Sequence, residues 1–576
     1  MRFKKWQRYA PLYAALLGTL AGCSDRVEEA TVSSAASKDA VAHFSWFEYQ
    51  GRDPVFDAPL SDDEFQNPIL AGFYPDPSIT RAGDYYYLAN SSFAFSPGVP
   101  IFRSTDMVNW ESLGHALTSP AQLPLAEQQT SRGIYAPTIR HHDGVFYLIT
   151  TLVDIRGNFI VTATDPAGPW SEPVLLPEIG GIDPDIFFDD DGRVYITHHH
   201  DPAGGSQYEG HKAIWLWEYD LANNKVIADS GRMVVDGGAD PSSKPVWIEA
   251  PHIFKKDGWY YLTCAEGGTE YNHSQVIFRT RNLAEPFVPF AGNPILTQRD
   301  LNRERPNPIT NTGHADFIET PNGEWWAVFL ASRSYNGSLF NTGRETFLLP
   351  VRWEDGWPII LDPQTEVAWR PKKPAGLKPM PASEPFTGNF TWRDAFSGDA
   401  LQHHWNQLRQ PDHSWYTLGG EKGGITLNVR PASLAELTQV SFIGRRQQHM
   451  HFSSSTEVTA PENHAVIAGL TVFQNEKHHF FAGVSQASGK YELVLEQANN
   501  SEPQVIQRLP LEKLTAGQPL IIGSEGNAGL ISFYYQLPGE AKVMIAEGLD
   551  ASMLSSEIAG GFIGTHIGLH ARINRH

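Results

Sequence analysis

The stretch Asp143-Gly144-Val145-Phe146-Tyr147-Leu148 joins an Asp-Gly turn signal to the apolar residues of a short strand. Asp-Gly or Asn-Gly between two apolar runs is typical of a tight β-hairpin. Similar phrases recur at intervals of 48 to 66 residues, with their glycines at positions 83, 144, 192, 258 and 323. Five such repeats in order predict a five-bladed β-propeller over residues 61–362, in preference to a β-sandwich whose turns are alike by chance.

One position in each repeat is expected to face the propeller axis. The residues eight or nine positions before the five turns are Asp76, Tyr135, Asp183, Glu249 and His314. The first strand of every blade lines the axis, so these five side chains are predicted to converge there. Three carboxylates in one small space raise one another's pKa, and burying them unpaired is costly. Their convergence therefore indicates chemistry rather than packing.

Length, composition and charge narrow the class of protein. The chain has 576 residues, a formal net charge of −21, and 50 Gly, 41 Pro and 67 aromatic residues (16 Trp, 20 Tyr, 31 Phe). This length predicts two or three domains, and the composition favours an all-β protein with many turns. The negative charge disfavours nucleic-acid binding. Two cysteines, Cys23 and Cys264, do not form a disulfide framework.

Three converging carboxyl groups fit glycoside hydrolysis. That reaction uses one ionised carboxylate, which activates water or attacks carbon, and one protonated carboxyl group, which donates its proton to the leaving oxygen. The pKa of the acid must be raised toward the working pH. A third carboxylate nearby can keep that pKa high and orient the acid.

Three segments carry a resemblance to glycoside hydrolase family 43. They read NPILAGFYPDPSI at residues 67–79, IDP at residues 182–184 and EAPH at residues 249–252. That family contains β-xylosidases and α-L-arabinofuranosidases built on a five-bladed propeller. The resemblance implies an inverting, exo-acting glycosidase that needs no metal for bond cleavage. It also implies xylo- or arabino-oligosaccharides derived from hemicellulose as substrates.

The resemblance implies a role for each carboxylate. Asp76 corresponds to the general base, Glu249 to the general acid, and Asp183 to the residue that tunes the pKa of the acid. Asp185 stands where the family often has serine or another small residue. Two positions from Asp183 on a strand, it should face the opposite side, and we expect it to be structural.

Four further pocket residues follow from the same resemblance. Phe93 and Tyr135 are expected to wall the space for the terminal sugar, and Arg344 to grip sugar hydroxyls. His314 matches the histidine of the family's central channel. Two roles stay open for it, a hydrogen bond in the core and contact with water or a structural calcium ion, although calcium prefers oxygen ligands.

The C-terminal third is expected to be a second β domain. Residues 363–385 are rich in proline and lysine and predict a stiff linker or wrapping segment. Short strands and turns over residues 386–576 predict a β-sandwich. The phrase FIGRRQQH at residues 442–449 resembles the concanavalin A-like sandwich of family 43 xylosidases, one loop of which helps to close the pocket. An independent carbohydrate-binding module is the alternative.

Residues 43–60 precede the propeller, and we expect them to pack on the sandwich. The phrase FSWFEY at residues 44–49 looks like the aromatic strand with which related sandwiches usually finish. The hypothesis is that residues 43–50 return as a strand of the C-terminal domain.

The N-terminus predicts export and a lipid anchor. Residues 1–22 combine four basic residues with a short apolar run, as in a secretory signal. They end in LAG before Cys23, which resembles a bacterial lipobox with Cys23 as the lipidated residue. Residues 23–42 are expected to be a flexible tether. These features predict a lipid-anchored protein of the bacterial outer membrane or periplasm, attached to the membrane only through its lipid.

Two classes of function remain open. The first is a glycosidase that releases terminal β-D-xylose, α-L-arabinofuranose, or both, with β-xylosidase favoured by the appended sandwich and α-L-arabinofuranosidase alone as an alternative. The second is a surface lipoprotein that binds glycans without cleaving them. The intact set of Asp76, Asp183 and Glu249 favours the enzyme.

Overall fold

The computed structural model describes residues 40–574 of the protein. The expected signal segment 1–22, the lipidation residue Cys23 and almost all of the expected tether lie outside this range. Within the described range, no helix combines the length and apolar character needed to cross a membrane. The helical elements are η1 (Pro54–Phe56), η2 (Pro241–Ser243), η3 (Ser552–Leu554) and α1 (Ser556–Ala559). The predicted all-β class is confirmed.

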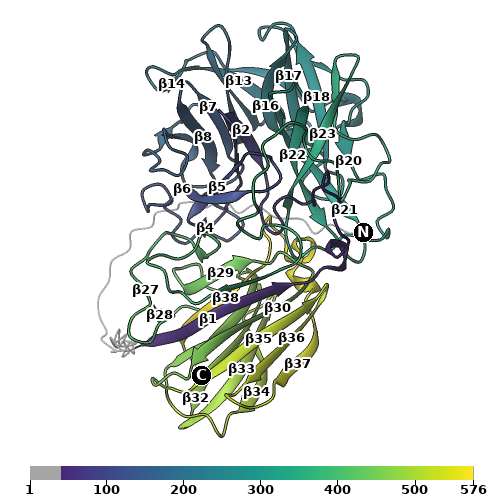
Figure 1. The fold of residues 1–576 in the computed structure, drawn as a ribbon. Coiled ribbons are helices and arrows are strands. Elements are labelled where there is room, and N and C mark those ends of the chain that lie inside the picture. Colours follow the sequence, from purple (N-terminus) through teal and green to yellow (C-terminus); the bar gives the residue numbers. More distant parts are fainter. Residues whose placement is uncertain (1–39, 575–576) are drawn as a thin grey trace, which may run out of the picture. The chain divides into compact units, whose positions relative to one another are not determined.

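Five antiparallel sheets form the blades of a propeller (Figure 1). Each blade begins with the strand nearest the axis, and each of these first strands contacts the first strand of the next blade, closing the ring from β21 to β2. The blades, in chain order, are β2 (Ser78–Ala82), β3 (Tyr85–Ala89), β5 (Gly98–Ser104) and β6 (Glu111–Leu117); β7 (Thr138–His142), β8 (Val145–Leu152), β9 (Gly157–Ala163) and β10 (Val174–Leu175); β11 (Ile182–Phe188), β12 (Val194–His200), β13 (Ala213–Asp220), β14 (Lys225–Val226) and β15 (Arg232–Asp236); β16 (Glu249–Lys256), β17 (Trp259–Glu266), β18 (Ser274–Thr280), β19 (Val288–Pro289) and β20 (Leu296–Thr297); and β21 (Ile309–Glu319), β22 (Trp325–Arg333), β23 (Glu345–Glu354) and β24 (Trp357–Ile359).

The repeated turn phrase makes the hairpin that opens each blade. Between β7 and β8, Asp143 and Gly144 both have positive φ angles, 48° and 79°. A two-residue loop of this kind matches the twist of the strands on either side and needs residues that tolerate left-handed backbone. The five-bladed propeller predicted from these phrases is confirmed.

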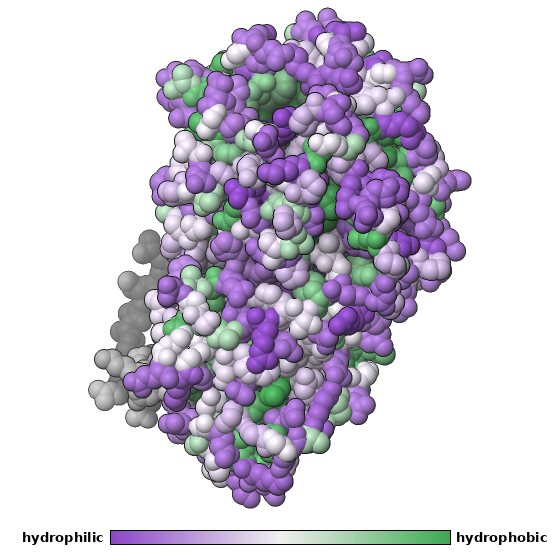
Figure 2. Space-filling model, in the orientation of Figure 1, coloured by the Kyte–Doolittle hydropathy of each residue, from purple (hydrophilic) through white to green (hydrophobic). Residues whose placement is uncertain are grey.

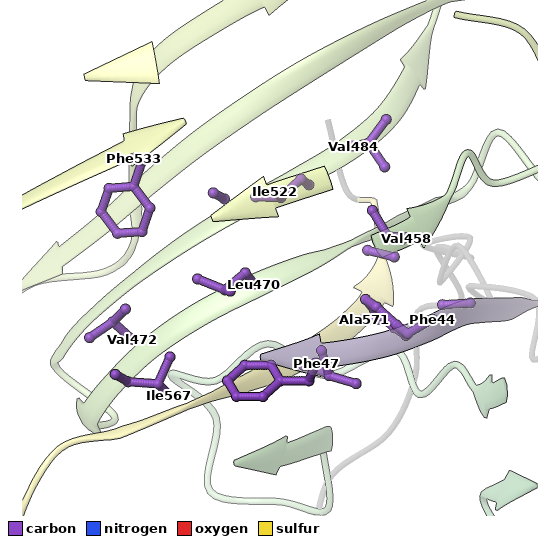
Figure 3. Close-up of a cluster of buried hydrophobic side chains, with 14 of the residues drawn as sticks. Phe44, Phe47, Val458, Leu470, Val472, Val484, Ile522, Phe533, Ile567 and Ala571 are labelled. Atoms are coloured by element: carbon purple, nitrogen blue, oxygen red, sulfur yellow. The ribbon is translucent and has the colours of Figure 1, made fainter. Parts of the chain in front are cut away.

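Two eight-stranded sheets form the C-terminal β-sandwich. The first contains β27 (Tyr416–Leu418), β28 (Ile425–Asn428), β1 (Val41–Gly51), β30 (His451–Thr459), β35 (Pro519–Asn527), β36 (Leu530–Gln536), β37 (Val543–Asp550) and β25 (Phe390–Asp394). The second contains β34 (Gln504–Pro510), β33 (Lys490–Asn499), β32 (His478–Ala487), β31 (Val466–Asn475), β38 (His566–Ile573), β29 (Ser441–Arg446), β26 (Asn406–Leu408) and β4 (Phe95–Ser96). Figure 3 shows apolar side chains of both sheets, among them Phe47 and Leu470, meeting in the core.

Two strands from outside the predicted sandwich belong to its sheets. β1, the purple strand in Figure 1, pairs with β30 on one side and with β28 and β25 on the other. The structure thus places residues 43–50 in the sandwich. The expected tether does not reach residue 42, because β1 begins at Val41 and pairs there with Asn428. β4 lies in the propeller part of the chain but pairs with β26.

The segment 363–385 runs along the outside of the propeller. It has no strand of its own, and its backbone carbonyls accept hydrogen bonds from the chain before the first blade: Phe65 N to Pro371 O at 3.0 Å and Asn67 N to Trp369 O at 2.9 Å. On the face shown in Figure 2, hydrophilic residues cover most of both domains. Large exposed apolar residues are spread over distant positions such as Leu175, Trp247 and Leu530.

Candidate active site

All seven residues that the sequence analysis assigned to the pocket line one cavity at the propeller axis. A cavity of about 60 Å³ is lined by Asp76, Phe93, Tyr135, Ala136, Ile182, Asp183, Glu249, Thr269, His314, Arg344 and Phe562. Asp76 lies just before β2, Tyr135 just before β7, and Asp183, Glu249 and His314 lie within β11, β16 and β21. The repeat-based convergence of these five positions therefore matches the geometry.

Local backbone strain accompanies this convergence. Asp76, Asp183 and His314 have φ angles of 52°, 54° and 52°, in the left-handed region that non-glycine residues rarely occupy. The pairing of β11, β16 and β21 with their neighbours also shifts register close to the pocket. Such irregularities re-aim side chains and cluster at functional sites. Here they direct the side chains toward the axis.

Asp76 is held by a hydroxyl group and a guanidinium group. The Ser91 hydroxyl donates a hydrogen bond to Asp76 Oδ2, and Arg344 Nη1 donates to Oδ1 at 2.7 Å. His314 Nδ1 lies 3.7 Å from the same Oδ1. The carboxylate is buried, and Arg344 compensates its negative charge. These contacts fix the orientation that a general base needs.

Glu249 and Asp183 form the acidic side of the pocket. Burial, then the neighbouring charge of Asp183, raises the pKa of Glu249 well above its usual value. Burial, then the charge of Asp76, raises the pKa of Asp183 to about 7, while the Ala250 backbone N–H donates to Asp183 Oδ2 at 3.2 Å. Glu249 Oε1 is buried and has no hydrogen-bond partner within residues 40–574. Its raised pKa favours the protonated form of Glu249, and Oε1 lines the pocket without a hydrogen bond to another described residue.

Arg344 and His314 complete the polar wall. Arg344 Nη2 donates to the carbonyl of Phe562 at 3.2 Å, so that one guanidinium joins the propeller's carboxylate to the sandwich. Burial lowers the pKa of His314 to about 3, which keeps its imidazole neutral. The His314 ring lies 6.3 Å from that of His252, and its Nδ1 lies 3.7 Å from the carboxylate of Asp76. Carboxylate oxygens are the ligands that calcium prefers. Among the described residues, no three His, Cys, Asp or Glu side chains are grouped to hold a metal ion. Contact of His314 with calcium therefore stays a prediction.

Asp185 takes no part in the pocket lining. Its carboxylate forms an ion pair of 2.9 Å with Arg140 and accepts the backbone N–H of Ile253 at 3.1 Å. Arg140 also pairs with Asp316 at 2.6 Å. This buried network joins the inner strands of four blades, which agrees with the structural role expected for Asp185.

Phe562 is the pocket residue that the sequence did not identify. It lies between α1 and β38 of the sandwich, and its ring stacks on Phe93 with centroids 6.0 Å apart and meets the edge of Tyr135 at 5.9 Å. A sandwich loop was expected to close the pocket, but no sequence signal singles out Phe562 within it. The glycine pair at positions 560 and 561, with φ angles of 73° and 81°, marks the sharp turn that precedes it.

Comparisons with known proteins agree with this architecture. The chain matches the profile of glycosyl hydrolases family 43 over residues 65–358 and that of the beta xylosidase C-terminal concanavalin A-like domain over residues 393–575. A xylosidase/arabinosidase of Butyrivibrio fibrisolvens is 38% identical over 519 residues, which cover 88% of this chain and 96% of the relative. A non-reducing end α-L-arabinofuranosidase of Bacteroides ovatus is 32% identical over 528 residues, 89% of this chain and 92% of the relative.

Solved structures show the same two-domain arrangement. A GH43_12 protein retrieved from a capybara gut metagenome superposes with a TM-score of 0.86 at 38% identity, covering 92% of this chain and 99% of that one. A xylan β-1,4-xylosidase of Bacillus halodurans superposes with a TM-score of 0.79 at 32% identity. The superposition covers 88% of this chain and 97% of that one. The axial pocket, the profile match and these likenesses all lead to one assignment: this chain belongs to glycosyl hydrolase family 43.

Proposed function

We propose that the protein is an exo-acting, inverting glycosidase that releases terminal β-D-xylose, α-L-arabinofuranose, or both, from hemicellulose-derived oligosaccharides. The observation that carries this proposal is the pairing, in one small pocket, of a buried glutamate whose pKa is raised with an oriented carboxylate. Glu249 Oε1 is free of hydrogen bonds, and Asp76 is held by Arg344 at 2.7 Å. The pocket is small and walled by the aromatic rings of Phe93, Tyr135 and Phe562, which favours a terminal residue over the middle of a long chain.

The proposed mechanism is a single displacement. Asp76 takes a proton from a water molecule as the water oxygen attacks the anomeric carbon. The bond from that carbon to the leaving oxygen breaks, and Glu249 transfers its proton to this oxygen. The configuration at the anomeric carbon is inverted. Asp183 keeps the pKa of Glu249 high, and Arg344 orients Asp76 and sugar hydroxyls, so bond cleavage itself uses no cofactor.

The names of the relatives support both sugars. One relative is called a xylosidase/arabinosidase, another a non-reducing end α-L-arabinofuranosidase, and one from Bacillus subtilis a beta-xylosidase. We favour β-xylosidase activity because the matched sandwich profile is that of the beta xylosidase C-terminal domain. α-L-Arabinofuranosidase activity is the second candidate.

Initial rates on aryl β-D-xyloside and aryl α-L-arabinofuranoside, for the wild type and for Asp76→Ala, test the proposal. We expect the wild type to cleave at least one substrate, and the variant to lose about 10²-fold or more, because the general base is gone. Proton NMR should show the inverted anomer of the released sugar first. A folded wild-type protein that cleaves neither substrate would leave the glycan-binding alternative standing.

We also propose that the mature chain is anchored to the bacterial outer membrane or faces the periplasm, through a lipid on Cys23. The support is the basic and apolar leader followed by the Leu-Ala-Gly-Cys motif. Cys23→Ala should move the protein from the membrane fraction to the soluble fraction without changing its specific activity. If the wild type and Cys23→Ala divide equally between the membrane and soluble fractions, the lipid anchor is contradicted.

A further inference from the structure

A second cavity, larger than the catalytic pocket, lies between the first blade and the sandwich. Its volume is about 570 Å³, within the range of about 300–1,000 Å³ that is usual for small-molecule sites. Pro97 and His115 line it from the propeller side, and residues 398–403, 405, 407, 413 and 416–418 line it from the sandwich. None of these residues lines the catalytic pocket.

An almost fully buried amide on this cavity has an unused donor. Gln407 is only 4% exposed, and its Oε1 accepts the indole N–H of Trp415 at 2.9 Å. An indole N–H can only donate, so the amide oxygen must face Trp415 and the amide nitrogen must face away from it. That nitrogen has no hydrogen-bond partner among the described residues, and Gln407 borders the cavity. Because Gln407 borders the cavity, this donor is open to a ligand or water there.

The same cavity presents an aromatic ring held in place by its neighbours. Tyr416 is half-buried and lines the cavity. Its ring packs against Trp415 with centroids 5.5 Å apart at 84°, and its hydroxyl bonds His413 Nδ1 at 2.7 Å. A ring fixed in this way loses little freedom when a ligand stacks on it.

The charge of the lining selects the class of ligand. The lining contains no lysine and no arginine, and its one carboxylate, that of Asp399, is exposed and makes no ion pair within residues 40–574. Three histidines, His115, His403 and His413, also line the cavity, so no permanent positive charge balances Asp399 and anions are disfavoured. A neutral ligand rich in hydroxyl groups can accept a hydrogen bond from Gln407, donate one to Asp399, and place a C–H face on Tyr416.

We propose that this cavity is a second binding site for neutral oligosaccharides built of pentoses, separate from the pocket that cleaves them. The choice of pentose chains rests on the proposed function of the catalytic pocket. The geometry supplies the remaining argument: an oriented amide donor, a carboxylate acceptor and a fixed aromatic ring around one cavity. Such a site would hold a substrate chain on the enzyme between successive cleavages.

Calorimetric titration with xylotetraose tests the proposal, in the full chain carrying Asp76→Ala so that the ligand survives. We expect two binding events per chain. Adding Tyr416→Ala should remove one event. Tyr535→Ala is the matched control, because Tyr535 is likewise half-buried against the sandwich core but borders neither cavity. It should leave both events in place.

A second cavity variant is needed in case Tyr416→Ala loses binding because it fails to fold. Ala400→Arg adds bulk and positive charge at an exposed position of the cavity lining and removes no contact, and it too should leave one event. The proposal is overturned if the Asp76→Ala protein shows no binding event, or if every event that it shows survives both cavity variants. Failure of the proposed function is recognised separately, because it appears as absence of aryl pentoside cleavage by the wild type.

Discussion

Asp76, Asp183 and Glu249 share one pocket with the guanidinium of Arg344, but their contacts with it differ. Arg344 contacts Asp76 directly at 2.7 Å. Glu249 receives no hydrogen bond at Oε1 and has its pKa raised by burial and by Asp183. In the proposed mechanism, these different surroundings separate two chemically similar groups into a base and an acid.

Asp183→Asn tests this separation through the pH dependence of kcat/KM. The wild-type profile should be bell-shaped, and its alkaline limb should mark the loss of the proton from Glu249. The charge of Asp183 raises the pKa of Glu249. Removing that charge lowers this pKa, so Glu249 loses its proton at lower pH. We expect the alkaline limb to move to lower pH and kcat/KM at neutral pH to fall by about 10²-fold.

Asp185→Asn is the matched control for that experiment. Asp185 lies two residues away on the same strand and pairs with Arg140 at 2.9 Å instead of lining the pocket. Its replacement should lower the melting temperature, because a buried guanidinium loses a partner. It should not shift the alkaline limb. Equal shifts in both variants would contradict the tuning role of Asp183.

At the scale of elements, β1 binds the N-terminal end of the described chain into the C-terminal domain. Phe44, Phe47 and Tyr49 on this strand are fully buried. The Phe47 ring meets Trp405 edge-on at 5.2 Å and Trp392 at 6.3 Å. In the described chain, the propeller segment thus lies between two segments of the sandwich, β1 in one sheet and β25 to β38 in both.

Phe47→Ala should therefore destabilise the sandwich by about 3–5 kcal/mol, the usual cost of deleting a buried aromatic side chain. Val41→Ala on the same strand is the control, because Val41 is 40% exposed and its loss should change stability little. Urea unfolding followed by tryptophan fluorescence measures both. Coincident unfolding curves for the two variants would show that β1 does not support the sandwich.

At the scale of the whole molecule, the sandwich completes a site that the propeller begins. The two domains belong to one compact unit. Arg446 of the sandwich donates to the carbonyl of Phe73 at 2.6 Å, three residues before Asp76. Thr565 N donates to Asn341 O at 2.9 Å, close to Arg344. The segment with Phe562 thus reaches the pocket from an anchored position.

Phe562→Ala removes one wall of the pocket while leaving the backbone carbonyl that Arg344 contacts. We expect KM for the preferred aryl pentoside to rise by about 10-fold with a smaller change in kcat, because stacking on the sugar is lost equally in ground and transition states. Ile558→Ala is the control, since Ile558 is 48% exposed on α1 of the same segment and does not line the pocket. Steady-state kinetics of both variants measure this effect. An unchanged KM in Phe562→Ala would contradict the role of Phe562 in closing the pocket.

The propeller and its axial residues could be predicted because both depend on local signals. Asp143-Gly144 specifies a two-residue turn through its own backbone preferences, and repetition of that turn places Asp76, Glu249 and their counterparts at one axis. The strand pairings of β1 and β4 and the position of Phe562 depend instead on burial against residues hundreds of positions away. The aromatic phrase in β1 indicated a sandwich strand but not its start, because residues 24–42 contain no glycine or proline to mark where the strand begins. A turn is determined by the backbone preferences of adjacent residues, so the sequence predicts it. Phe562 closes the pocket only when the two domains pack together, so the tertiary structure decides its role.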